Sequence, residues 1–145
     1  MAETASLSPS GSTDAAWDAT TRRAGFAWII RDENSAFPLT GTGVIEDVAS
    51  PLMAEALALY EGIKKAKDLG LASITLRSDC ATLIRVISTK SQISELYGVL
   101  QDIKSLSSFF VSINFQQIPR SQNREADFLA KRALKASLAF FISLG

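Results

Sequence analysis

The feature that most restricts the fold is a short apolar segment that ends abruptly in polar residues. Ser73–Leu76 is mostly β-branched or apolar, which indicates a buried strand. Arg77, Ser78 and Asp79 follow, and apolar residues then resume at helical spacing. Asp79 is therefore expected at the carboxyl end of a strand and the start of a helix. In an open α/β sheet, ligands usually bind in the crevice at the carboxyl ends of the strands, so an acid there is placed to hold a metal ion.

Asp79 also has a simpler explanation. Ser78 or Asp79 would serve as the N-cap of the following helix, because a side-chain oxygen there accepts hydrogen bonds from unpaired amide groups. For one acid considered alone, the N-cap is the better explanation. Three further acids in unusual positions, which are Asp14, Glu55 and Asp127, favour a functional site instead.

The composition excludes several kinds of site. The chain has 145 residues, enough for one domain with a core, and 47% of them are hydrophobic. It has no histidine, which excludes Ser-His-Asp and Cys-His triads and histidine-bound zinc. Carboxylates are the remaining candidates for catalytic or metal-binding groups. Fifteen basic residues balance fifteen acidic ones, so nucleic acid would have to bind at a local basic patch.

The ends of the chain give no sign of a targeting or membrane segment. Residues 1–11 are small and mostly polar, without the layout of a signal peptide, and we expect a disordered segment followed by one domain over residues 12–145. The apolar segment 136–144 is too short to span a membrane. A single cysteine, Cys80, excludes an internal disulfide. We expect an intracellular monomer, in the nucleus or cytoplasm, with no membrane partner.

Periodicity predicts an α/β domain that begins with three strands. The third of these contains Pro38, which cannot donate to a strand ladder, so this strand is expected at a sheet edge. Ser50 and Pro51 mark a helix start, and Gly70 marks its end. The predicted strands are residues 12–18, 24–31, 37–45, 73–76 and 109–118, and the predicted helices are 51–69, 79–88, 94–106 and one from about 121 to at least 135.

Four acids lie where a carboxylate is hard to explain by solvation. Asp14 is in the middle of a strand beside alanines, where an unpaired carboxylate is costly. Glu55 lies roughly 60° from the centre of the apolar stripe of its helix, and Asp127 is on the flank of the last helix. Carboxylates that meet raise one another's pKa and destabilise the fold unless a cation compensates. Mg²⁺ and Mn²⁺ prefer oxygen ligands and are the natural compensators.

The motifs around these acids resemble those of the ribonuclease H family, in particular the reverse-transcriptase-like RNase H domain common in plant genomes and retroelements. The motifs are TDAAW, MAEALAL, LRSDC and IPRSQNREADFLAKRAL, and the resemblance extends from about Thr13 to the C-terminus. It implies an α/β fold whose mixed five-stranded sheet, with three antiparallel strands first, is flanked by helices. It also implies metal-dependent cleavage of the RNA strand of RNA–DNA hybrids.

The resemblance assigns catalytic and metal-binding roles to the four acids. Asp14 would bridge two Mg²⁺ or Mn²⁺ ions, Asp79 and Asp127 would hold the ion on the side of the attacking water, and Glu55 would hold the ion near the leaving group. Two-ion hydrolysis does not require a histidine. Charged residues on an exposed helix often serve solubility alone. Candidate contacts to nucleic acid are Ala15, Ala16, Arg120, Asn123, Arg124, Lys131 and Lys135.

Several departures from the family pattern support a second hypothesis. Ala15 and Ala27 stand where many members have glycine, and segment 116–120 lacks the mobile histidine of better-studied members. A basic helical protrusion is missing near residues 90–94. These departures favour a catalytically weak or inactive domain that binds nucleic acid or a protein. The intact set of four acids favours an active enzyme, because clustered acids without a cation would destabilise the fold.

Overall fold

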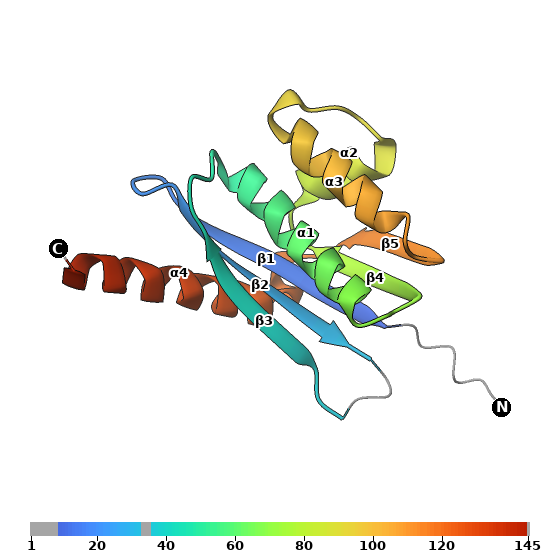
Figure 1. The fold of residues 1–145 in the computed structure, drawn as a ribbon, viewed down its shortest axis with the longest axis horizontal. Helices are drawn as coiled ribbons and strands as arrows, with labels where there is room; N and C mark the ends of the chain where they lie inside the picture. Colours follow the sequence, from blue (N-terminus) through green and yellow to red (C-terminus); the bar gives the residue numbers. More distant parts are fainter. Residues whose placement is uncertain (1–8, 33–35, 145) are drawn as a thin grey trace.

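The computed structural model describes residues 9–32 and 36–144, with side chains up to residue 139 (Figure 1). Residues 1–8 of the segment predicted to be disordered lie outside this described part. The order of strands and helices is the predicted one. The elements are β1 (Ser10–Asp18), β2 (Arg23–Arg31), β3 (Leu39–Ile45), α1 (Pro51–Asp68), β4 (Ser73–Ser78), α2 (Ala81–Thr89), η2 (Ser94–Leu96), α3 (Tyr97–Ser107), β5 (Ser112–Gln117), η3 (Arg120–Gln122) and α4 (Arg124–Leu144).

The sheet has five strands in the order β3-β2-β1-β4-β5. β1 pairs antiparallel with β2, and β2 with β3, whereas β4 runs parallel to both β1 and β5. Helices α1, α2 and α3 lie on one side of the sheet and α4 lies on the other (Figure 1). The predicted mixed five-stranded sheet is therefore confirmed, and β3 is at an edge as predicted, although Pro38 lies just before the strand rather than within it.

Helix α1 supplies the main apolar layer on its side of the sheet. It begins as predicted, with the Ser50 hydroxyl accepting a hydrogen bond from the Met53 N–H at 3.1 Å. It ends before Gly70, whose φ of +75° favours glycine. Leu59 and Ile63 are completely buried in a cluster with the β4 residue Leu76. This packing fixes the direction in which Glu55, one turn before Leu59, meets the sheet.

Helix α4 packs on the sheet with almost no space between the two backbones. A Cβ atom added at Gly25 in β2 would lie 2.3 Å from the carbonyl oxygen of Ala130. Ala126 and Ala130 are each 1% exposed and face the sheet with small side chains. Glycine at position 25 is thus required by the close approach of α4. In the described part of the chain, no helix is both long and apolar enough to cross a membrane.

Several predicted boundaries were wrong by two or three residues, and three of these differences have a clear structural consequence. β1 begins at Ser10, so the last two residues of the segment predicted to be disordered belong to the sheet. β5 begins at Ser112, because the N–H groups of Phe109 and Phe110 bond to the last carbonyls of α3 and form turns. Phe109 and Val111 are consequently 66% and 86% exposed. The last helix begins at Arg124, after the short η3 helix.

Candidate metal centre

The sheet opens between β1 and β4 at the position of two acids. The two strands pair in parallel from Ser10 and Thr75 to Ser12 and Arg77, where the ladder of paired residues ends. Extending the same register by two residues brings Asp14 beside Asp79. β4 ends at Ser78, so Asp79 lies just past the carboxyl end of the strand, as predicted. The two carboxylates therefore face each other where the strands separate.

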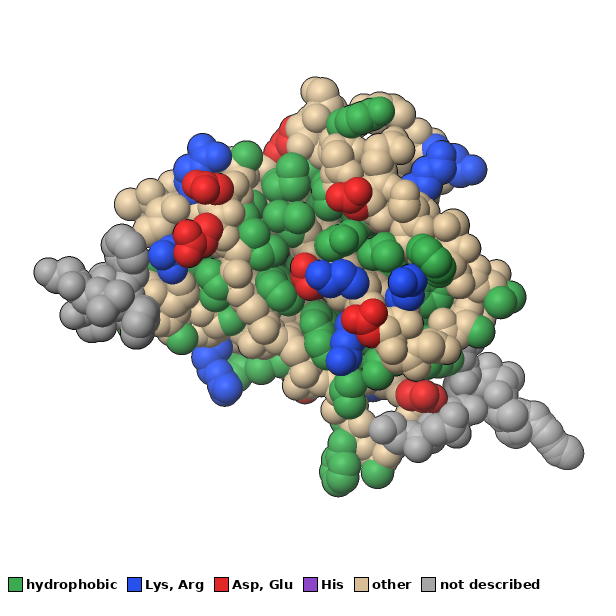
Figure 2. Space-filling view, viewed as in Figure 1, with side chains coloured by type: hydrophobic (Ala, Val, Ile, Leu, Met, Phe, Trp, Pro, Cys, Tyr) green, Lys and Arg blue, Asp and Glu red, His purple; other side chains and the backbone are tan. Residues whose placement is uncertain are grey.

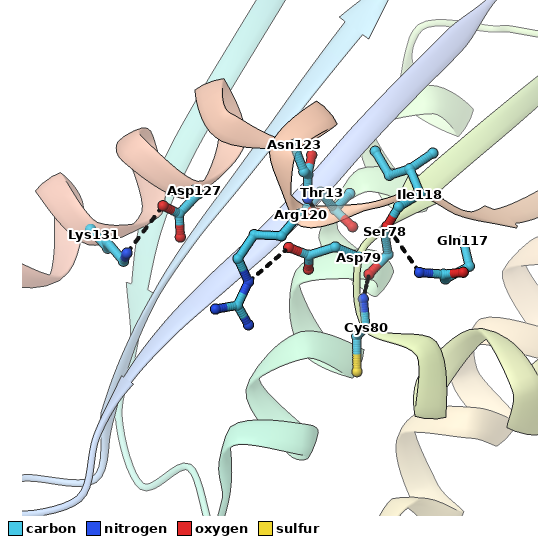
Figure 3. Close-up of polar contacts among 10 residues, drawn as sticks. All are labelled: Thr13, Ser78, Asp79, Cys80, Gln117, Ile118, Arg120, Asn123, Asp127 and Lys131. Atoms are coloured by element: carbon cyan, nitrogen blue, oxygen red, sulfur yellow. Dashed lines mark hydrogen bonds and ion pairs between the residues drawn. The ribbon is translucent and has the colours of Figure 1, made fainter.

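The N-cap explanation does not account for Asp79. The N-cap of α2 is Cys80, and no side chain makes a cap hydrogen bond there. Ser78 is completely buried, and its hydroxyl accepts a hydrogen bond from the Cys80 N–H at 3.0 Å (Figure 3). Ser78 thus stabilises the turn after β4, and this leaves the Asp79 carboxylate to other partners.

Three carboxylates from three elements converge in this opening. Asp14, Glu55 and Asp79 each offer an oxygen, and these oxygens all lie within 4.8 Å of one another. Asp14 is 3% exposed, and the Asp79 side chain is 8% exposed. Among the described residues, the buried Oε1 atom of Glu55 has no hydrogen-bond partner. The cluster is therefore largely withdrawn from water and contains an unused acceptor.

Burial and mutual repulsion hold protons in this cluster. Burial and then the charge of Asp79 raise the pKa of Asp14 to about 7. For Glu55, burial comes first, followed by the charge of Asp14 and a hydrogen bond with it, and the pKa rises to about 9. The cluster therefore retains a proton at neutral pH, which a bound cation would displace.

Asp127, the fourth predicted ligand, is near the cluster but not part of it. Its side chain is 31% exposed and pairs with Lys131, with 3.1 Å between Oδ2 and Nζ (Figure 3). Its charge still contributes to raising the pKa of Asp14, although less than burial and Asp79 do. The structure thus brings three of the four predicted acids together and places the fourth at the margin.

Arg120 supplies a positive charge to the cluster. Its Nε lies 3.7 Å from Oδ2 of Asp79, while the Arg120 side chain remains 89% exposed (Figure 3). The Arg120 charge also acts to lower the pKa of Glu55, against the larger effects that raise it. The sequence analysis named Arg120 only as a candidate contact to nucleic acid and missed this pairing. The only signal was its position seven residues before Asp127.

Asn123 has a structural role that differs from its predicted contact with nucleic acid. It is 2% exposed, and its Nδ2 donates to the carbonyl oxygen of Thr13 at 3.0 Å. The hydrogen bond joins the residue before α4 to the residue before Asp14. Its side chain is therefore held by the protein, and it positions α4 against the strand that carries the central acid.

The remaining candidates lie on both sides of the cluster. Ala15 and Ala16 are half-buried and follow Asp14 in β1, with Ala15 packed against a small cluster that contains Val48. On α4, the exposed candidates are Arg124, Lys131 and Lys135. Their contacts to nucleic acid remain predictions.

The donor set fits a hard divalent cation. All three converging ligands are carboxylates, and hard cations take oxygen ligands. A cation would also use the orphaned Glu55 Oε1 and offset the repulsion that raises the pKa of Asp14. The residues present therefore suit a metal ion better than an empty acidic pocket.

Similarity to known proteins agrees with this geometry. A family model described as reverse transcriptase-like matches residues 12–133. No curated protein matches the sequence. RNase H1 of the halophilic archaeon Halobacterium salinarum superposes with a TM-score of 0.81 at 23% identity, covering 90% of this chain and 99% of that one.

Two further solved structures are similar. The N-terminal RNase H domain of a Mycobacterium tuberculosis protein has a TM-score of 0.81 at 23% identity, covering 92% of this chain and 98% of that one. LC11-RNase H1, isolated from compost and solved with an RNA/DNA hybrid, has a TM-score of 0.79 at 21% identity, covering 90% and 99%. At these identities the superpositions show a shared fold.

Proposed function

Because the chain belongs to the reverse transcriptase-like family of RNase H domains, we propose that it is a metal-dependent endonuclease that hydrolyses the RNA strand of RNA–DNA hybrids. The fold alone would not support an activity. The observation that carries the proposal is the convergence of Asp14, Glu55 and Asp79, whose ligand oxygens lie within 4.8 Å of one another. The hybrid bound to LC11-RNase H1 supports the choice of substrate.

Each of the four acids would have its own role in binding the metal ions. Asp14 would contact two ions, Asp79 and Glu55 would hold one each, and Asp127 would complete the Asp79 side. The ions would be Mg²⁺, with Mn²⁺ as a substitute, and when bound they would supply an activated water and stabilise the leaving oxygen. In the structure the Oδ2 atom of Asp127 is paired with Lys131, which would compete with the metal for this carboxylate.

The cations around the site would then serve the substrate. Arg120 and Lys131 are exposed and paired with Asp79 and Asp127. Once those carboxylates hold metal, both side chains would be available to phosphate oxygens. The backbone of Ala15 and Ala16, directly after Asp14, is the candidate for reading the 2′-hydroxyl that distinguishes RNA from DNA.

Cleavage of a labelled RNA–DNA hybrid tests the proposal. With Mg²⁺ or Mn²⁺, the wild-type protein should cut only the RNA strand. Asp14→Asn and Asp79→Asn should each lower the rate by more than about 100-fold, because several kcal/mol of transition-state stabilisation is lost. Asp102→Asn is the matched control, since Asp102 is exposed on α3. Equal rates in all four proteins would contradict the assignment of the site.

A second candidate is a hybrid-binding domain with little or no turnover. The observation that favours it is that Asp79 and Asp127 are already paired with Arg120 and Lys131, which compete with metal for these carboxylates. Binding of hybrid without cleavage, with either metal, would establish this alternative. The intracellular location and the monomeric state both remain predictions.

A further inference from the structure

Helix α4 presents an exposed aromatic ring within a row of cations. Phe128 is 59% exposed, although it is a large apolar side chain. Residues three or four positions apart share one face of a helix. On that spacing, the face that contains the ring consists of Arg124, Phe128, Lys131 and Lys135.

The ring has a cation beside it and follows in sequence the acid at the margin of the cluster. It directly follows Asp127, whose carboxylate pairs with Lys131 at 3.1 Å. The guanidinium carbon of Arg132 lies 5.8 Å from the ring centroid, within the range of a cation–π contact. The ring is therefore flanked by positive charge while much of its surface faces solvent.

The charge of this face suits a polyanion. The two acids at the start of α4 are both paired, Glu125 with Arg31 at 3.0 Å and Asp127 with Lys131. The exposed basic residues therefore dominate along the helix. On the face that carries α1, by contrast, basic and acidic side chains are interspersed (Figure 2). A local basic patch is what a chain without net charge needs to hold nucleic acid.

We propose that Phe128 stacks on an unpaired base in a single-stranded extension of the hybrid. Bases within a duplex are covered on both faces by their neighbours, so an aromatic side chain stacks on a base that has left the duplex. Aromatic rings set in a positively charged groove bind single strands in this way. The inference rests on the proposed function, and it adds a substrate class, namely hybrids that continue into a single strand.

Fluorescence anisotropy in EDTA tests this without cleavage. The probes are a blunt hybrid, a hybrid with an RNA extension and a hybrid with a DNA extension. The wild-type protein should bind an extended hybrid more tightly than the blunt one, and the two extensions identify the strand that is bound. Phe128→Ala should weaken binding of the extended hybrid by roughly fivefold or more, as expected for one lost base stack, and leave the blunt hybrid almost unchanged.

Two further variants separate stacking from a general effect of the substitution. Phe128→Trp should preserve the preference, and its indole fluorescence should be quenched when the extended hybrid binds. Phe37→Ala is the matched control, because Phe37 is an exposed phenylalanine (80%) that precedes β3 and does not belong to α4. It should bind all three probes as the wild-type protein does.

Three outcomes would overturn the inference. The first is equal affinity of the wild-type protein and Phe128→Ala for the extended hybrids. The second is a loss of affinity in Phe128→Ala that is as large with the blunt hybrid as with the extended ones. The third is self-association of the protein, seen in sedimentation, that depends on Phe128. The last result would assign the ring to a contact between two copies of the chain. Because binding is measured without metal, loss of the cleavage activity would refute the proposed function and leave this result standing.

Discussion

Replacing the central acid should stabilise the protein without metal. Asp14 is 3% exposed, and its pKa rises from 3.8 to about 7, first through burial and then through the charge of Asp79. In the unfolded chain the group ionises near pH 3.8, so the unfolded state releases its proton first as the pH rises. The free energy of unfolding therefore falls between about pH 4 and pH 7, and the full penalty persists above pH 7.

The size of this penalty follows from the two pKa values. Each tenfold change in an ionisation constant corresponds to about 1.4 kcal/mol, so a rise from 3.8 to about 7 sets an upper limit of about 4 kcal/mol. The amide in Asp14→Asn still loses its hydration on burial, and Glu55 shares a proton with Asp14 in the wild-type protein. We therefore expect a gain of about 2 kcal/mol at pH 8, or about 7 °C in Tm for a domain of this size.

Thermal unfolding in EDTA, followed by circular dichroism at several pH values, measures this difference. The gain should be small at pH 4 and should reach its full size near pH 8. Asp102→Asn, an exposed acid on α3, should leave Tm unchanged at both pH values. If Asp14→Asn lowers Tm at pH 8, burial among like charges does not raise the pKa of Asp14, and the reasoning is refuted.

Three further predictions concern the same region. Mg²⁺ should raise the Tm of the wild-type protein at pH 8 and have little effect on the Tm of Asp14→Asn. At a Mg²⁺ concentration a hundredfold above Kd, the free energy of unfolding should rise by about 2.7 kcal/mol. Asn123→Ala should cost about 1–3 kcal/mol in urea unfolding, because the buried Thr13 carbonyl loses its partner; an unchanged midpoint would argue against that role. Gly25→Ala should cost more than about 2 kcal/mol in the same assay, because its Cβ would meet the Ala130 carbonyl at 2.3 Å, and a neutral result would show that α4 can move.

Local signals predicted the elements that carry the acids. The change from β-branched to polar residues at Arg77 places the end of β4 within two residues, and Ser50 with Pro51 marks the start of α1. Both signals are local, because each marks the end of a strand or the start of a helix from a few neighbouring residues. The start of β5 could not be predicted in this way, because alternation at Phe109 and Val111 looks the same in a turn as in a strand.

The site was predictable in position but not in its contacts. Motifs identified the acids because each lies at a distinct place in its own element. Which charges pair is decided by distances across the fold, so neither the contact of Arg120 with Asp79 nor the burial of Asn123 could be derived from spacing. The protons retained by Asp14 and Glu55 likewise depend on burial that only the packed structure provides.

The hydrogen bond from Asn123 to Thr13 also affects the order in which contacts can form during biosynthesis. The two residues are 110 positions apart, so Thr13 leaves the ribosome long before its partner exists. Until β4 has been made, one edge of β1 has no neighbour, and Asp14 has Glu55 but not Asp79 beside it. The repulsive cluster therefore forms only after most of the stabilising core is available. A nascent chain that has not yet passed β4 lacks Asp79, so its acidic cluster is incomplete.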